Sequence, residues 1–356
     1  PYQSLVQSLK EISLADLSSK DDMAKKLFMS QGITFTVYNS GEGIEKIFPF
    51  DIIPRIIHAS EWAHIERGIK QRIKALNIFL EDVYHNQFIL KDGIVPAALV
   101  YSCPNYLREM VDVKVPHGIY THIAGVDLIR DSDGSFYVLE DNLRTPSGVS
   151  YMLENRNMTY RIFPGLLPKS NVRSVKDYPD LLLKNLKALS PQQKSEPRVV
   201  LLTPGIFNSA YFEHTTLARL MGIELVEGRD LVVDNAKVYM KTTAGLKQID
   251  VIYRRVDDEF IDPLVFNPDS ILGVSGIYYA FRKGNVALVN APGNGVADDK
   301  AIYPYVPAMI KYYLNEEPIL KTVPTYSLDN PDHFKLVFDS VHKMVIKKTN
   351  ESGGYG

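Results

Sequence analysis

The sequence has little cysteine and little net charge. Cys103 is the one cysteine among 356 residues, so no disulfide can form within the chain, which fits a reducing, cytoplasmic location. The formal net charge of −2 provides no broad basic surface for nucleic acid. No apolar run of about 18 residues and no signal peptide are visible, so we expect neither membrane insertion nor export. The first residue is Pro1 rather than methionine, from which we expect that the natural beginning is missing.

The composition is otherwise ordinary for a globular protein. Hydrophobic residues make up 45% of the chain and charged residues 23%. The length suffices for about two domains. We predict a helical N-terminal region with a β-hairpin at 1–190, an α/β unit at 198–330 and a short last region at 331–356. The polar run 190–197 is the best linker between the first two.

Apolar periodicity predicts the secondary structure of both halves. In the first half we expect a strand at 32–38 and helices at 1–30, 60–86 (capped by Ser60), 150–160 and 178–189. In the second half a strand (198–202), a helix (211–221, ended by Gly222) and a strand (223–226) indicate a parallel α/β layer. Further strands are expected at 238–240, 250–254 and 344–347, and helices at 304–314 and 333–342.

A β-hairpin in the first half brings together three oxygen-bearing side chains. The apolar runs 123–129 and 136–139 flank Asp133-Gly134, a dipeptide typical of two-residue hairpin turns. If Ser132 pairs with Ser135 across that turn, Asp127 lies opposite Glu140, and Asn142 shares their face. Carboxylate and amide oxygens of this kind suit Mg²⁺ that bridges to phosphate groups.

The hairpin has two alternative interpretations. Acidic turns are common, so a polar hairpin end facing solvent is a simple alternative. A calcium loop fits poorly, because Ile129 would occupy the first ligand position if Gly134 were the obligatory glycine.

The C-terminal end carries a second signal. A strand ending in Lys347 runs into a glycine-rich turn with Ser352, Gly353, Gly354 and Gly356. Backbone N–H groups in such a turn can surround phosphate oxygens, and the lysine adds a positive charge. The segment matches neither a Walker loop nor G-x-G-x-x-G, and a flexible tail is the alternative. Together with the hairpin, the nucleotide interpretation is favoured.

With these motifs the chain resembles the circularly permuted ATP-grasp family, relatives of glutathionylspermidine synthase-like carboxylate–amine ligases. The most specific match is the run Glu-Asp-Asn-Leu-Arg-Thr-Pro-Ser-Gly at 140–148. Supporting matches lie at 48–55, 202–205, 252–258 and 295–300. The resemblance implies a mixed α/β fold of circularly permuted ATP-grasp type with a Rossmann-like pre-ATP-grasp unit. It also implies that the metal strands precede the lysine and glycine loop along the chain.

The resemblance further implies a ligase that uses ATP and Mg²⁺ to join a carboxylate to an amine through an acyl phosphate. Asp127, Glu140 and Asn142 would hold the metal, Lys347 and the glycine loop would cover the phosphates, and Arg144 would contact the acyl phosphate. An ion pair of Arg144 with Asp141 or Glu154 is the structural alternative.

Two features depart from the family pattern. Many relatives with the synthase activity carry arginine two residues before the metal aspartate, where this chain has Gly125. Arg130 or Arg144 is expected to take over that role, and the substrate class is open. The chain also stops inside the glycine loop, so we expect the rest of the lid to lie beyond Gly356 and the fragment to bind ATP poorly.

Further candidates are weaker. Side chains after the first strand of the α/β unit could bind substrate, although capping is the simpler account: Asn208, Ser209, Tyr211, Glu213 and His214. Of Arg254 and Arg255, which point to opposite faces, at most one is expected to bind substrate. Asp298, Asp299 and Lys300 line either the cleft or a solvated turn. We interpret His117 and His122 as structural, and Cys103 has no histidine partner for nucleophilic catalysis.

Two rival functions stay open at this point. One is a phosphotransferase on the same fold, and the other is a non-catalytic ATP-grasp scaffold that binds partners. The substrates are expected to be a peptide-like or amino-acid carboxylate and an amine, of unknown identity, and the oligomeric state is not predicted. Nucleic acid and membrane are not expected as partners.

Overall fold

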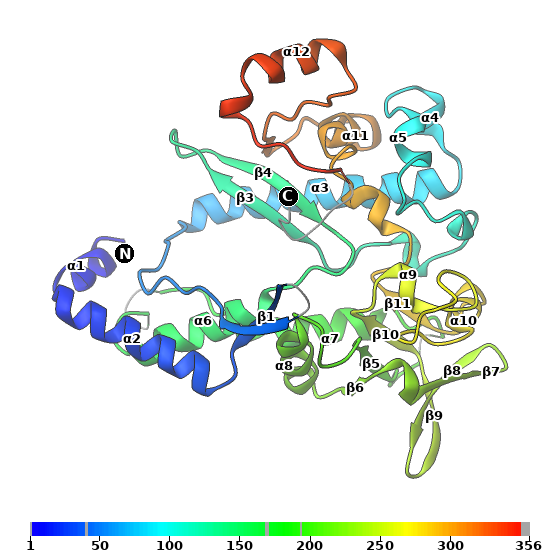
Figure 1. Ribbon diagram of the computed structural model, residues 1–356, viewed down its shortest axis with the longest axis horizontal. Helices are drawn as coiled ribbons and strands as arrows, with labels where there is room; N and C mark the ends of the chain where they lie inside the picture. Colours follow the sequence, from blue (N-terminus) through cyan, green and yellow to red (C-terminus); the bar gives the residue numbers. More distant parts are fainter. Residues whose placement is uncertain (1, 40–41, 168–170, 193, 350–356) are drawn as a thin grey trace.

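The computed structural model describes residues 2–39, 42–167, 171–192 and 194–349. The long helix α3 (Ala59–Tyr84) runs along a hairpin of β3 (Gly125–Arg130) and β4 (Phe136–Asn142) (Figure 1). Buried side chains of the hairpin, α3 and the chain near Leu320 form a small apolar cluster that joins these elements. The short strand β12 (Lys321–Thr322) adds to β4 in parallel, so the candidate metal strands belong to a three-stranded sheet.

Helix α3 begins earlier than the sequence suggested. Its N-cap is His58, and Ser60 already lies inside the first turn, so the predicted capping by Ser60 is wrong. The carboxylate of Glu61 accepts a hydrogen bond from the His58 backbone N–H at 2.8 Å, which provides the polar contact at this end.

The N-terminal part packs against helix α6 (Val149–Ile162). The single helix expected at 1–30 is in fact two helices, α1 (Tyr2–Lys10) and α2 (Leu14–Ser30). The break occurs because the Ser13 hydroxyl caps α2 by accepting the Asp16 N–H. A hairpin of β1 (Thr34–Asn39) and β2 (Glu42–Ile47) follows. The aromatic rings of Phe28 in α2 and Tyr151 in α6 belong to the apolar core of this part.

A four-stranded parallel sheet forms the α/β unit, as the sequence predicted. Its strand order is β11 (Ala287–Val289), β10 (Val251–Arg254), β5 (Val199–Leu202) and β6 (Glu224–Val226). Val199 and Leu201 face α7 (Tyr178–Ala188) and α8 (Tyr211–Met221), whereas the alternate residues Val200 and Leu202 enter the main core on the other face. Both faces are covered, which explains the uninterrupted apolar strands.

The strand expected at 238–240 exists but belongs to a separate sheet. It is β8 (Lys237–Thr242), which pairs antiparallel with β7 (Leu231–Asp234) and β9 (Gly245–Ile249). The remaining helices are short: α4 (Phe88–Lys91), α5 (Ala97–Tyr101), α9 (Asp258–Ile261), α10 (Ile277–Arg282) and α11 (Val306–Leu314). The 3-10 turns are Arg108–Met110, Pro116–Gly118, Gly228–Asp230, Asn294–Asp298, Tyr303–Tyr305 and Val341–Lys343.

The last described part lies above the hairpin in Figure 1 and begins with α12 (Pro331–Asp339). The Asn330 side chain caps this helix by accepting the N–H groups of Asp332 and His333. The strand predicted at 344–347 is wrong, because those residues have irregular backbone. Within the described ranges, no helix is both long and apolar enough to cross a membrane.

Candidate metal and nucleotide site

Asp127 lies directly opposite Glu140, as the sequence predicted, although the path between them differs. The turn is longer than expected: Asp131 pairs with Ser135, and Gly134 adopts a positive φ of 83° as its N–H donates to the Asp131 carbonyl. A β-bulge at Leu139 then shifts the register by one residue. The two departures offset each other and restore the Asp127–Glu140 pair.

The bulge decides which side chains share a face. Val138 and Asp141 are buried toward α3, whereas Glu140 and Asn142 lie on the opposite face together with Asp127. In the described part of the chain, no group of three or more His, Cys, Asp or Glu side chains could hold a metal ion. The candidate set has only two carboxylates and an amide. Such a set suits Mg²⁺, which keeps several waters and takes further oxygens from substrate phosphates.

Two lysines neutralise Glu140. The Lys300 Nζ lies 2.8 Å from Oε1 and the Lys347 Nζ lies 3.3 Å from Oε2. Burial acts to raise the pKa of Glu140, but the hydrogen bonds and charges of Lys300 and Lys347 outweigh it and lower the pKa. The sequence had left the role of Lys300 open, and the structure brings it to the candidate metal face.

Asp127 has the opposite shift. Burial and the charge of Glu140 raise its pKa, and this effect exceeds the lowering by the Asn142 hydrogen bond and the Lys347 charge. A carboxylate held next to a second carboxylate is stabilised by a cation. The electrostatics of the pair therefore fit a metal ligand role.

Arg144 follows the metal strand and pairs with neither Asp141 nor Glu154. Its Nε lies 2.6 Å from Oδ2 of Asp298, whose other oxygen accepts the Leu143 N–H. A Cβ on Gly295 would lie 2.8 Å from the Arg144 side chain, so only glycine leaves room for this arginine. Asp298, whose role was open, thus orients Arg144.

Asp141 is bound to a residue that the sequence did not single out. Arg72 of α3 binds Asp141 through Nε and Nη2, with the shortest contact at 2.6 Å, and both side chains are 2% exposed. A guanidinium and a carboxylate in this two-pronged geometry form a strong, directional pair. The pair fixes β4 against α3 at the residue between Glu140 and Asn142.

The loop 143–148 after β4 is held by buried side chains that belong to the α/β unit around the parallel sheet. Asn290 donates to the carbonyls of Leu143 and Arg144 and accepts the N–H groups of His122 and Ile123. Arg255 donates to the carbonyls of Thr145 and Pro146. The carboxylate of Glu213 accepts the N–H groups of Gly148 and Ser150 and so caps α6 from another element.

Most of the residues considered as less certain substrate ligands are buried among the side chains that hold the loop after β4. Arg254 is fully buried and donates to three carbonyls (Val256, Asn290 and Ala291) in addition to pairing with Asp258. Glu213 and His214 are each 1% exposed, and the His214 ring hydrogen-bonds to the Thr203 hydroxyl.

Near the start of α8, the Asn208 side chain accepts the Ala210 N–H. Helix α8 begins at Tyr211 after the N-cap Ala210, so neither Asn208 nor Ser209 is the N-cap residue. The ring of Tyr211 lies edge-on to that of His214, with 6.5 Å between centroids. Asn208, Ser209 and Tyr211 are partly or fully exposed, unlike Glu213 and His214.

Arg130 is not brought to the metal face. It lies on the α3-facing side of β3 and pairs with Glu61 at 2.6 Å. Pro146 packs close to Gly125, where a Cβ would come within 3.0 Å, so the glycine allows the loop after β4 to approach. The predicted phosphate loop residues Ser352, Gly353, Gly354 and Gly356 lie outside the described residues.

Cys103 is buried, and His122 is partly buried. Cys103 donates its S–H to Asp299, and burial together with that carboxylate raises its pKa to about 12. A thiol with this pKa is a poor nucleophile. Burial lowers the pKa of His122 to about 4.

Comparison with known families matches residues 54–356 to a family described as "A circularly permuted ATPgrasp". The chain belongs to this circularly permuted ATP-grasp family. An uncharacterized protein of Synechocystis sp. is 52% identical over 99% of this chain and 73% of its own length. An uncharacterized protein of Mycobacterium tuberculosis is 50% identical over 100% of this chain and 64% of its own length.

A more distant relative carries a functional name. It is the Frankia alni protein "Putative glutamate--cysteine ligase 2-3", 38% identical over 100% of this chain and 41% of its own length. Among solved structures, a glutathione synthetase like-effector from Globodera pallida superposes with a TM-score of 0.55 at 11% identity. It covers 86% of this chain and 69% of its own, and it supports the fold alone. The resemblance read from the sequence is confirmed at the level of family and fold.

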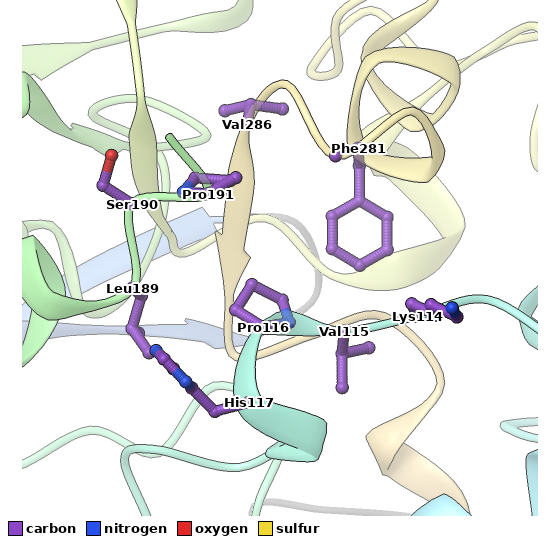
Figure 2. A pocket seen from close by; sticks show the side chains of 10 residues that line it. Lys114, Val115, Pro116, His117, Leu189, Ser190, Pro191, Phe281 and Val286 are labelled. Atoms are coloured by element: carbon purple, nitrogen blue, oxygen red, sulfur yellow. The ribbon is translucent and has the colours of Figure 1, made fainter. Parts of the chain in front are cut away.

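A hollow of about 290 Å³ lies elsewhere on this ATP-grasp chain (Figure 2). Its lining includes Pro116, His117, Phe281 and Val286, and none of the candidate metal or nucleotide residues takes part. Val286 directly precedes β11, so the hollow adjoins the amino end of this parallel strand. Ligands of open α/β sheets bind at the opposite, carboxyl ends.

Proposed function

We propose that the chain carries the magnesium and ATP site of a carboxylate–amine ligase. The observation that carries the proposal is the face shared by Asp127, Glu140 and Asn142, on which Lys300 and Lys347 contact Glu140. Oxygen ligands for a divalent cation thus lie within reach of two ammonium groups that can bind phosphates. Membership of the ATP-grasp family supports ATP as the nucleotide.

Each residue has a defined role in this proposal. Asp127, Glu140 and Asn142 would hold Mg²⁺, which would neutralise charge on the nucleotide phosphates. Lys300 and Lys347 would leave Glu140 to bind phosphate oxygens. Arg144, held by Asp298, would offer its remaining N–H groups to the transferred phosphoryl group.

The substrates proposed are an amino-acid or peptide-like carboxylate and an amine. The carboxylate oxygen attacks the γ-phosphorus of ATP and forms an acyl phosphate, with ADP as the leaving group. The amine nitrogen then attacks the acyl carbon, phosphate leaves, and the nitrogen loses a proton as the amide forms. The printed name of the Frankia alni relative supports this class of substrate. The parallel sheet from β5 to β11 would serve as the Rossmann-like pre-ATP-grasp unit.

Calorimetric titration with Mg·ATP tests the nucleotide site. We expect weak binding to the wild-type chain, as the sequence predicts, that is lost in Asp127→Asn and Glu140→Gln. Asp131→Asn is the matched control, because Asp131 is an exposed acid at the hairpin turn. Equivalent substitutions in the longer Synechocystis relative repeat the test in a second protein. Equal binding by all variants, or no binding by the folded wild type of either protein, would refute the site and favour the scaffold function.

Hydroxylamine trapping separates the ligase from a phosphotransferase. A ligase that forms an acyl phosphate will convert its carboxylate substrate to a hydroxamate in the presence of Mg·ATP and hydroxylamine. We therefore expect hydroxamate from a screen of amino acids and short peptides, and none with Glu140→Gln. Phosphorylated product that resists hydroxylamine would instead indicate a phosphotransferase.

A further inference from the structure

Both carboxylate oxygens of Glu140 are occupied by ammonium groups of this chain. Lys300 binds Oε1 and Lys347 binds Oε2. The side chains of Glu140 and Lys300 are 18% and 19% exposed, so this contact is partly shielded from water. Hydrogen bonds to charged groups contribute more than neutral ones, particularly where water is partly excluded.

A divalent cation needs the same oxygens. Oxygen lone pairs that accept N–H donors from two lysines are not open to a metal, and the two ammonium groups also repel a cation electrostatically. Asp127 and Glu140 carry two negative charges, which Lys300 and Lys347 balance. A bare cation entering this face would therefore meet a site that is already neutral.

We propose that Lys300 and Lys347 form an ionic latch on Glu140 that excludes free divalent cations and opens when nucleotide phosphates take up the lysines. This inference rests on the proposed nucleotide site and adds that metal and nucleotide depend on each other for binding there. Metal and nucleotide then bind cooperatively, because phosphates release Glu140 for the metal and the metal neutralises the phosphates. By thermodynamic linkage, each ligand tightens the binding of the other by the same factor.

The latch also positions the C-terminal segment 344–349 over the metal strands. The Lys300 backbone N–H donates to the Thr349 carbonyl at 3.0 Å, and Lys347 belongs to the segment itself. Val345 is 83% and Ile346 61% exposed, so apolar burial contributes little to this attachment. Polar contacts through the two lysines therefore hold the segment, and loss of the Glu140 contact should loosen it.

Titration of the nucleotide-free chain with Mn²⁺, followed by electron paramagnetic resonance, tests the latch. We expect weak binding by the wild type and binding on the order of tenfold tighter in Lys300→Met and in Lys347→Met, since each removes one hydrogen bond to the carboxylate. Adding Glu140→Gln to either variant should abolish the gain. Lys321→Met is the matched control, because the Lys321 ammonium lies over the Tyr137 ring rather than on Glu140.

A non-hydrolysable ATP analogue should reverse the change in Mn²⁺ affinity that the lysine substitutions cause. With the analogue present, Lys300→Met and Lys347→Met should bind Mn²⁺ more weakly than the wild type, because the lysines then hold phosphates. Hydrogen exchange adds a conformational readout. Mn²⁺ bound to Lys300→Met should break the Lys347 contact to Glu140 and speed exchange in the peptide 341–349, which then keeps the backbone hydrogen bond from residue 300 to Thr349.

The outcomes separate this inference from the proposed function. Lysine variants that bind Mn²⁺ no more tightly than the wild type or Lys321→Met overturn the latch, even if Mg·ATP binds normally. Tighter Mn²⁺ binding that depends on Glu140 supports the exclusion of free cations by the two lysines even if no nucleotide binds, in which case the nucleotide site and the opening of the latch by phosphates fail together. Absence of Mn²⁺ binding in every variant also overturns the latch.

Discussion

The two sides of the candidate site are held in different ways. On the acidic side, the loop 143–148 after β4 is bound by buried side chains of Asn290, Arg255 and Glu213. On the basic side, the segment 344–349 has irregular backbone and carries the exposed Val345 and Ile346. Its contacts with the metal strands and the neighbouring loop include Lys347 to Glu140 and Thr349 to Lys300.

This difference indicates which side is fixed before ligands arrive. Buried hydrogen bonds on the acidic side hold the oxygen ligands and Arg144 in one geometry, so little conformational entropy is lost there on binding. The basic side buries little apolar surface and can rearrange at low cost, which suits the proposed movement of this segment around a nucleotide.

Breaking the buried ion pair beneath the acidic side should cause the largest loss of unfolding free energy. Arg72→Met leaves the Asp141 carboxylate buried without its partner, and removal of one partner of a buried pair costs about 3–5 kcal/mol. Chemical denaturation measures this loss. Arg130→Met is the matched control, because the Arg130–Glu61 pair is more exposed and should contribute about 1 kcal/mol or less. Equal losses in both variants would contradict a special role for the buried pair.

Acid should also weaken the fixed side. Burial and the charge of Arg255 lower the pKa of His214 to about 3 in the folded protein. In the unfolded chain, the pKa of His214 has the ordinary histidine value of about 6.5. The unfolded state therefore holds more protons between pH 6.5 and 3, and stability falls as the pH drops through this window. From pH 7 to pH 5 the loss due to His214 is about 2 kcal/mol.

Denaturation midpoints recorded across this pH range check the assignment. His214→Gln keeps a side-chain amide for Thr203 but cannot titrate, so its stability should fall less steeply with acid. His342→Gln alters an exposed histidine of the basic side and should leave the wild-type slope unchanged. An unchanged slope in His214→Gln would show that another group causes the acid sensitivity.

The sequence predicts the elements whose residue pattern is local. The strand–helix–strand unit from β5 to β6 was found to within one residue, because apolar periodicity and Gly222 determine it. The Asp127–Glu140 register was also correct, although the turn and the bulge at Leu139 each shift it by one residue. Nothing in the residue types around Leu139 signals a bulge.

Contacts between distant segments do not follow from residue spacing; the resemblance to the permuted family, not a local pattern, assigned Lys347 to the same site as Glu140. Asp141 and Arg72 lie 69 positions apart, and Glu140 and Lys347 lie 207 apart, so no spacing rule relates them. The strand expected at 344–347 has suitable β-branched residues, but no strand among residues 2–39, 42–167, 171–192 and 194–349 pairs with it. Strand formation depends on that pairing more than on intrinsic preference.

A smaller loss is expected from the cap that Glu213 provides. Glu213→Gln keeps the shape of the side chain but removes the negative charge that strengthens its hydrogen bonds from the N–H groups of Gly148 and Ser150. We expect it to lower the free energy of unfolding by about 1–2 kcal/mol. Faster hydrogen exchange in the first turn of α6 should accompany the loss. Glu196→Gln serves as the control, since this exposed glutamate pairs only with Lys187 at the surface. A loss no greater than that of the control would mean that the cap does not fix the loop.

The smallest effect is expected in α12, the last described helix, which precedes the basic segment 344–349. Phe338 is 72% exposed, and its stacking on the ring of Phe334 leaves both rings open to water. Phe338→Ser should change the unfolding free energy by no more than about 0.5 kcal/mol, as for most surface positions. Phe79→Ala in α3, where the ring is fully buried, should cost about 3–5 kcal/mol in the same assay. A loss above 1 kcal/mol for Phe338→Ser would show that α12 is packed in solution. Loose attachment on the basic side would then be confined to the segment 344–349 and would not extend to α12.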